Sequence, residues 1–233
     1  MSVPYHDILA AAGTRCNALV GAKAGPLETT YLTRPLTAAN FQSSIFPFSD
    51  YIAQTASAVQ KLSQTIADVR DHPWRRNLAG RTADLASGAT IPAADNAGAS
   101  IIGVYGNVID SDDGQVLSEQ PDETIRRRLL TPSLWKIPVY HFSLTGDSIL
   151  HTRTEVYLEV CVLDYGALIT AIGANDDMAL PDVLAEAVIC GTVALMVRDD
   201  EFVLQAGTYA EYFAETLKAI RGGATVLPVK EAA

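Results

Sequence analysis

The sequence predicts an α+β protein, an antiparallel helical bundle with an inserted region rich in β-hairpin structure. Three observations predict this class. The last third of the chain has the apolar spacing of two adjacent helices, and an earlier segment repeats the helical spacing over about six turns. Between them lies a long run of alternating apolar and polar residues, which is typical of strands.

The C-terminal helix pair is the centre of this prediction. Residues 181–198 are apolar on nearly every side, which is typical of a helix buried between other helices. Residues 203–221 carry a narrow apolar stripe at steps of three and four, formed by Val203, Ala206, Ala210, Phe213, Leu217 and Ile220. Because only a few residues around Asp199 and Asp200 separate the two segments, we expect them to pack antiparallel.

Two helices are predicted ahead of the strands. Pro4 suits a first helical turn, and an apolar face follows it at Ile8, Leu9, Ala12, Cys16, Leu19 and Val20. Ser49 or Asp50 is the expected N-cap of a second helix, which runs to Asp71 and stops at Pro73. Its stripe is Ile52, Thr55, Val59, Leu62, Ile66 and Val69. Because this stripe matches that of the last helix, we expect the two helices to pack together.

The middle of the chain is predicted to be the β-rich insertion. The predicted domains are residues 1–78 with 164–223 for the helical core, 79–163 for the insertion and 224–233 for a tail. Within the insertion we expect a strand at Ile101–Ile109, a turn at Asp110–Gly114 and a short helix at Pro121–Leu130.

The clearest β signal is a hairpin. Strands at Lys136–Ser143 and Ser148–Leu163 flank the turn pair Gly146-Asp147. The second strand is predicted to be continuous and half-buried, with one face formed by Leu150, Thr152, Thr154, Val156, Leu158, Val160 and Val162.

Composition narrows the functional classes. The chain has 233 residues, 48% of them apolar, and a net charge of −10. From Cys161 onward there are eleven Asp and Glu against four Lys and Arg, which argues against tight phosphate binding in that third. The cysteines Cys16, Cys161 and Cys190 lack CxxC spacing and are expected to be buried free thiols. No apolar run approaches a membrane span and no signal peptide is recognisable, so we expect a soluble protein with no membrane partner.

No catalytic or metal-binding motif stands out. GxSxG, the P-loop pattern, HExxH and GxGxxG are absent. Asp110–Gly114 begins like a calcium loop, but the glycine and glutamate that should follow are Gln115 and Pro121. His141 and His151 could meet across the hairpin, although a metal there would need further ligands. The sequence therefore predicts no catalytic residue, no cofactor and no metal.

Basic residues beside tryptophans are the candidate interface. They gather after Trp74 and again before Trp135. A solvated surface and ordinary packing would explain them, and the alternative is docking onto an acidic partner subunit. The candidate interface residues are Trp74, Arg75, Arg76, Arg126, Arg127, Arg128 and Trp135.

Two pairs of segments resemble a known family. Leu180-Pro181-Asp182-Val183-Leu184, followed by Tyr209-Ala210-Glu211-Tyr212-Phe213, resembles the last helix pair of tailed-phage head-to-tail adaptors, also called connector or head-completion proteins. Leu134-Trp135-Lys136-Ile137, leading to Ile149-Leu150-His151-Thr152-Arg153-Thr154, resembles a hairpin of podophage-type adaptors. The resemblance covers about half of the chain and rests on packing signatures.

The resemblance implies a structural virion protein, made in the host cytoplasm, rather than an enzyme. Such a protein forms a homo-oligomeric ring, typically of twelve copies, between the portal protein and a tail or nozzle protein. DNA passes through the lumen without specific binding, past carboxylates such as Asp176, Asp177 and Asp199–Glu201. Residues 79–163 depart from the smallest adaptors, and the resemblance does not say what they contact. The alternatives are a small enzyme or ligand-binding domain that uses the β insertion, and another ring-forming tail-completion protein.

Overall fold

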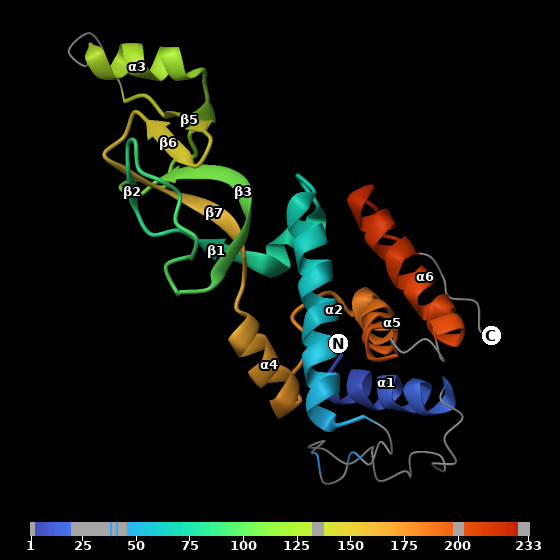
Figure 1. Cartoon of the computed structure of the whole chain (residues 1–233). Coiled ribbons are helices and arrows are strands. Elements are labelled where there is room, and N and C mark those ends of the chain that lie inside the picture. The colour runs from blue at the N-terminus through green and yellow to red at the C-terminus, as the bar shows by residue number, and fades with distance from the viewer. Residues whose placement is uncertain are drawn as a thin grey trace. The chain divides into compact units, whose positions relative to one another are not determined.

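The computed structural model describes residues 3–19, 38, 41, 46–131, 138–197 and 203–227. They form the predicted α+β class, with helices packed together and antiparallel and mixed sheets inserted in the middle of the chain (Figure 1). The chain divides into a helical unit, Met1–Asn77 with Asp164–Ala233, and a β unit, Leu78–Leu163. The elements are α1 (Tyr5–Leu19), α2 (Phe48–Asp68), η2 (Pro73–Leu78), β1 (Ala79–Arg81), β2 (Leu85–Ala86), β3 (Ser100–Asp110), β4 (Ser118–Glu119), α3 (Asp122–Leu130), β5 (His141–Thr145), β6 (Ser148–His151), β7 (Glu155–Leu163), α4 (Tyr165–Ala174), η4 (Asp182–Leu184), α5 (Ala185–Met196) and α6 (Val203–Arg221).

Helix α5 is the centre of the helical unit, as predicted from its apolar surface. It packs against α1, α2 and α6, which surround it in Figure 1. Its buried residues are Ala187, Val188, Ile189, Cys190, Gly191, Thr192, Val193 and Met196. The helix begins later than predicted, because Asp182–Leu184 forms the separate 3-10 turn η4 and leaves Val183 48% exposed. In the described part of the chain, no helix is long and apolar enough to cross a bilayer.

The predicted stripes of α2 and α6 are only partly correct. In α2, Ile52 and Val69 are half-buried, and small residues outside the stripe are buried because α2 touches α1, α4, α5 and α6. In α6, Ala210 is exposed whereas Tyr212 and Thr216 are buried. Helix α6 packs chiefly on α5 and less on α2, so its buried face is rotated from the predicted one.

The ends of α2 also differ from the prediction. The helix begins at Phe48, with Pro47 in the N-cap position and no side-chain cap, so neither Ser49 nor Asp50 caps it. It ends at Asp68, where the amide of Val69 bonds the carbonyl of Ile66 at 3.3 Å. The chain therefore leaves the helix one turn before the proline that was expected to stop it.

Helix α4 is absent from the predicted elements. Its N-cap is Asp164, whose carboxylate accepts from the amide of Ala167 at 2.9 Å. Its C-cap is Asn175, which has the left-handed backbone conformation that often ends a helix. Leu168 and Ile172 are buried, and the helix packs against α2.

Strand β7 is the axis of the β unit. It pairs antiparallel with β1, β2 and β3, and its partners in β3 run from Ser100, opposite Leu163, to Asp110, opposite Val156. The strand, turn and short helix predicted between residues 101 and 130 are confirmed as β3, the turn after it and α3. A second sheet contains β4, β5 and β6, and α3 packs against its β5 and β6 strands. The core residues are Leu85, Val108, Leu117, Phe142, Ile149, Val156, Leu158 and Val160.

The predicted hairpin exists, but the prediction that its second strand is long and continuous is wrong. The turn at Gly146-Asp147 joins β5 to β6, with Thr145 paired to Ser148. A bend at residues 152–154 then separates β6 from β7, and the two strands belong to different sheets. The bend also changes which residues point inward. Ile149 and His151 are buried before it, and Val156, Leu158 and Val160 after it, so Leu150 and the two threonines do not continue the inner face.

Candidate interaction surfaces

Helix α3 presents the predicted Arg126–Arg128 run. Ile125 anchors the helix and has no exposed surface. Asp122 accepts a hydrogen bond from the Ser143 hydroxyl at 3.0 Å and pairs with the Arg126 guanidinium at 2.7 Å. Arg126 is the main reason that the pKa of the Asp122 carboxyl lies below its usual value. Arg126 and Arg127 are exposed, and Arg128 is half-buried.

The last turn of α3 exposes apolar side chains next to these arginines. Leu129 is 45% exposed and Leu130 is 82% exposed. Trp135, the other candidate near this helix, lies outside the described residues. We call the exposed group Arg126, Arg127, Leu129 and Leu130 the basic end of α3.

The second predicted basic surface is largely buried. Trp74 and Arg75, in η2, are only 7% and 3% exposed. The Trp74 amide donates to Nδ1 of His72 at 3.2 Å, and Nε2 of His72 lies 3.3 Å from the Ala224 carbonyl oxygen. Trp74 and Arg75 are therefore packing residues of this chain and do not offer a docking surface, which corrects the prediction for these two. Arg76 alone of this group is exposed.

A compact acidic surface lies where the N-terminal segment meets the loop before α5. The amide of Tyr5 donates to the Asp176 carbonyl at 2.9 Å, and the amide of Met178 donates to the Val3 carbonyl at 2.9 Å. The amide of Val3 donates to the Asp182 carboxylate at 3.2 Å. These bonds gather exposed carboxylates around Val3, next to the exposed Val183. We call Asp7, Asp176, Asp177, Asp182 and Val183 the acidic patch.

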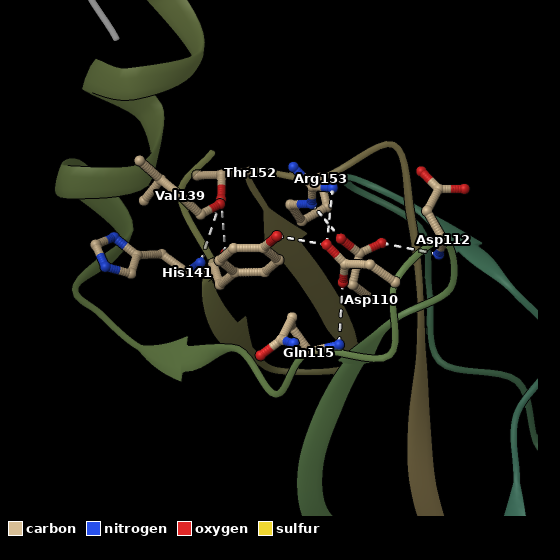
Figure 2. A network of polar contacts seen from close by, with 9 residues as sticks. Asp110, Asp112, Gln115, Val139, His141, Thr152 and Arg153 are labelled. Atoms are coloured by element: carbon tan, nitrogen blue, oxygen red, sulfur yellow. Dashed lines mark hydrogen bonds and ion pairs between the residues drawn. The ribbon is translucent and has the colours of Figure 1, made fainter. Parts of the chain in front are cut away.

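A polar network of the β unit joins its two sheets. Asp110 ends β3, Tyr140 precedes β5, and Arg153 lies in the bend between β6 and β7. The Arg153 guanidinium donates to the Asp110 carboxylate, lies 3.7 Å from the carboxylate of Asp113 and sits 4.7 Å from the Tyr140 ring centre. Asp110 also accepts a hydrogen bond from the backbone amide of Asp112 at 3.0 Å, and Figure 2 shows Asp110 facing Arg153 while the Asp112 carboxylate points away.

This network is suited to holding structure and not to acid–base chemistry. Asp110 has no exposed surface, and its charge is balanced by Arg153. The Tyr140 hydroxyl donates to Asp113, and this bond is the main reason that the pKa of the Asp113 carboxyl is lowered and the pKa of Tyr140 is raised. A general base would need a pKa moved toward neutrality, and a nucleophilic tyrosine would need a lowered pKa. Sequence reasoning missed this network, because its members are up to 43 residues apart.

The two hairpin histidines do not converge. His151 pairs with Phe142 across the hairpin, so its side chain lies on the face of Phe142, and His141 points to the opposite face. His151 is fully buried with Nε2 3.1 Å from the Leu85 carbonyl oxygen, and burial lowers its pKa. The described residues contain no group of three His, Cys, Asp or Glu side chains placed to hold a metal ion.

An open pocket of about 480 Å³ lies beside the start of α3 and is a candidate ligand site. Its lining is Glu119, Gln120, Pro121, Asp122, Ser143, Leu144 and Thr145. The Ser143 hydroxyl donates to Asp122, whose lowered pKa makes it a poor proton acceptor. Since a serine nucleophile needs an adjacent base, this pocket has no activated group.

The cysteines are buried, as predicted. All three are free thiols, and burial raises the pKa of Cys16 to about 11. Near Cys190, Arg15 makes a bidentate pair with Glu186 at 2.7 and 2.9 Å, which ties α1 to α5. A buried thiol with a raised pKa is a weak nucleophile, so Cys16 is a core residue.

Comparison with known proteins gives no family for this chain. No model of a known protein family matches the sequence, and neither does a curated protein.

Proposed function

We propose that the protein is a structural virion component, a head-to-tail adaptor of a tailed phage, and not an enzyme. One observation carries the proposal. A helical unit built on the buried helix α5 is interrupted in the chain by a β unit, which is the layout of the adaptors that the sequence resembles. In such a role the copies form a ring, typically of twelve, between the portal protein and a tail or nozzle protein.

The character of the described polar groups supports a role in assembly. The ion pair of Glu186 joins two helices, the pair of Asp110 joins β3 to the bend after β6, and the Asp122–Arg126 pair lies within α3. The exposed charge instead lies in the basic end of α3 and in the acidic patch. Surfaces of opposite charge favour specific docking between proteins and raise their association rate.

The excess of carboxylates in the last third of the chain suits a channel for DNA. From Cys161 onward the chain carries eleven Asp and Glu against four Lys and Arg. Carboxylates repel phosphates, so a duplex that passes them stays mobile. Asp199–Glu201, which were expected at the lumen, lie outside the described residues.

Mass photometry of the purified chain tests this proposal. An adaptor should give a closed oligomer of defined copy number, alone or after the portal protein is added, and that oligomer should bind portal. A chain that stays at 24.9 kDa under both conditions would refute the ring. An oligomer that ignores portal but binds tail tube protein would instead indicate a tail-completion protein.

A further inference from the structure

The basic end of α3 is a local exception in an acidic unit. Residues 126–136 carry four Lys and Arg and no Asp or Glu, whereas the rest of 78–163 carries eleven Asp and Glu and two Arg. Arg126 has Asp122 as its partner, but Arg127 forms no ion pair with another described residue. The positive charge of this end is therefore available to a second surface.

Apolar side chains accompany the charge. Leu130 is 82% exposed and lies one turn after Arg126 and Arg127. Burying such a leucine against a partner removes apolar surface from water and is favourable. Arginine is enriched at protein interfaces, where its guanidinium can bind a carboxylate through two hydrogen bonds.

The basic end is also held firmly in place. Ile125 fixes the helix in the core, and the Asp122–Ser143 bond ties its first turn to β5. The Arg153–Asp110 pair then joins the β5–β6 sheet to β3. A surface held in its bound conformation loses less entropy on binding, so this arrangement favours docking.

The acidic patch has the complementary properties. Asp176 and Asp177 are exposed there, and the neighbouring Val183 is 48% exposed. Asp176, Asp177 and Asp182 of the patch belong to the stretch 164–197, which contains no Lys or Arg.

We propose that the basic end of α3 on one copy docks onto the acidic patch of the next copy in the ring. This inference rests on the proposed ring. Pairing either surface with itself would oppose like charges, so the contact joins two different surfaces and is heterologous. A heterologous contact repeated by rotation closes into a ring, whereas a contact of one surface with itself stops at a dimer. The proposal assigns Asp176 and Asp177 to this contact and leaves Asp199–Glu201 for the lumen.

Charge-reversed variants test the contact. One variant carries Arg126→Glu with Arg127→Glu, and the other carries Asp176→Arg with Asp177→Arg. Each alone should raise the concentration for half-assembly by about tenfold or more, because the reversed charges oppose each other. An equimolar mixture should assemble again, because in a ring of alternating variants one contact joins two unaltered surfaces and the next joins two reversed surfaces, which are again opposite in charge. The control for the arginine variant is Lys61→Glu with Lys218→Glu, two exposed lysines on α2 and α6, which changes the net charge by the same amount and should leave assembly unchanged.

The outcomes separate this inference from the proposed function. If the unaltered chain forms rings and both reversed variants assemble like the control, the contact is wrong and the ring stands. Reversed variants that fail alone and also fail when mixed would equally overturn the contact. If the unaltered chain stays monomeric with and without portal, the proposed function itself fails. Binding to phosphatidylserine vesicles that is lost in the Arg126→Glu, Arg127→Glu variant, with assembly unchanged, would assign the basic end to a membrane instead. Circular dichroism confirms that each variant is folded.

Discussion

At the scale of single residues, Asp110 is a carboxylate without exposed surface whose charge is balanced by Arg153. Replacing Arg153 with Met leaves that carboxylate buried and without its cation. We expect Arg153→Met to lower the free energy of unfolding by about 3 kcal/mol, because an uncompensated buried charge is costly. Urea unfolding followed by circular dichroism measures the change.

The exposed pair Arg81–Asp84 provides the control for this prediction. Its two side chains are 46% and 40% exposed, and their atoms lie 2.8 Å apart. Arg81→Met should cost less than about 1 kcal/mol, because water screens an exposed pair. Equal losses in the two variants would mean that the Asp110 network does not hold the β unit together.

His151 gives the β unit a dependence on pH. Burial lowers the pKa of His151, so the unfolded chain takes up its proton more readily than the folded chain does. Above about pH 6.5, the usual pKa of an unfolded histidine, His151 is neutral in both states and costs the folded state nothing. As the pH falls from there toward the lower pKa of His151 in the folded chain, the free energy of unfolding decreases. In that window the free energy of unfolding should fall by up to about 1.4 kcal/mol per pH unit.

The variant His151→Gln should flatten the stability profile between pH 7 and pH 5. His141 contributes in the same direction, because burial lowers its pKa too, so His141→Gln is the matched comparison. The carboxyls of Asp113 and Asp122 have lowered pKa values and act only at more acidic pH, below about 4. An unchanged slope in His151→Gln would show that this histidine does not charge on unfolding.

At the scale of elements, the contact of α5 with α6 depends on a glycine. A Cβ added at Gly191 would lie 2.8 Å from the Phe213 ring and 3.0 Å from the Ala58 Cβ. Gly191→Ala should therefore cost about 1–3 kcal/mol through overpacking, although alanine is the better helix former. The matched variant is Gly207→Ala in α6, where an added Cβ would meet nothing within 4 Å. This variant should raise the free energy of unfolding by up to about 1 kcal/mol. Thermal unfolding that ranks the two variants in the opposite order would contradict this packing.

Elements with a single strong local signal could be predicted from the sequence. Helix α5 was predicted because it is apolar on all sides, and the β5–β6 turn because Gly146-Asp147 suits a hairpin. The break at residues 152–154 could not be predicted, because Thr152-Arg153-Thr154 fits the alternation of a strand. Contacts distant in sequence favour the bend, since Arg153 binds Asp110 and Thr152 binds the carbonyl oxygen of Val139. Helix α4 did carry local signals, in Asp164 and Asn175 at its two ends.

At the scale of the whole molecule, the candidate surfaces were predictable where exposure follows from local sequence. Arg126 and Arg127 of α3 are exposed because this short polar helix has one buried residue, Ile125. Trp74 and Arg75 were not predictable, because their burial depends on contacts that reach Ala224 through His72. The acidic patch also depends on tertiary structure, since bonds from Val3 to Met178 and Asp182 bring its carboxylates together.

The most direct test of the central claim is an electron cryo-microscopy map of the head–tail junction in particles that contain this chain. A head-to-tail adaptor predicts one closed ring of identical copies between portal and tail, of about 300 kDa for twelve chains of 24.9 kDa. In that ring α3 should contact the neighbouring copy, and the lumen should be lined by carboxylates. A junction without this chain, or a chain present as isolated copies elsewhere in the particle, would contradict the account.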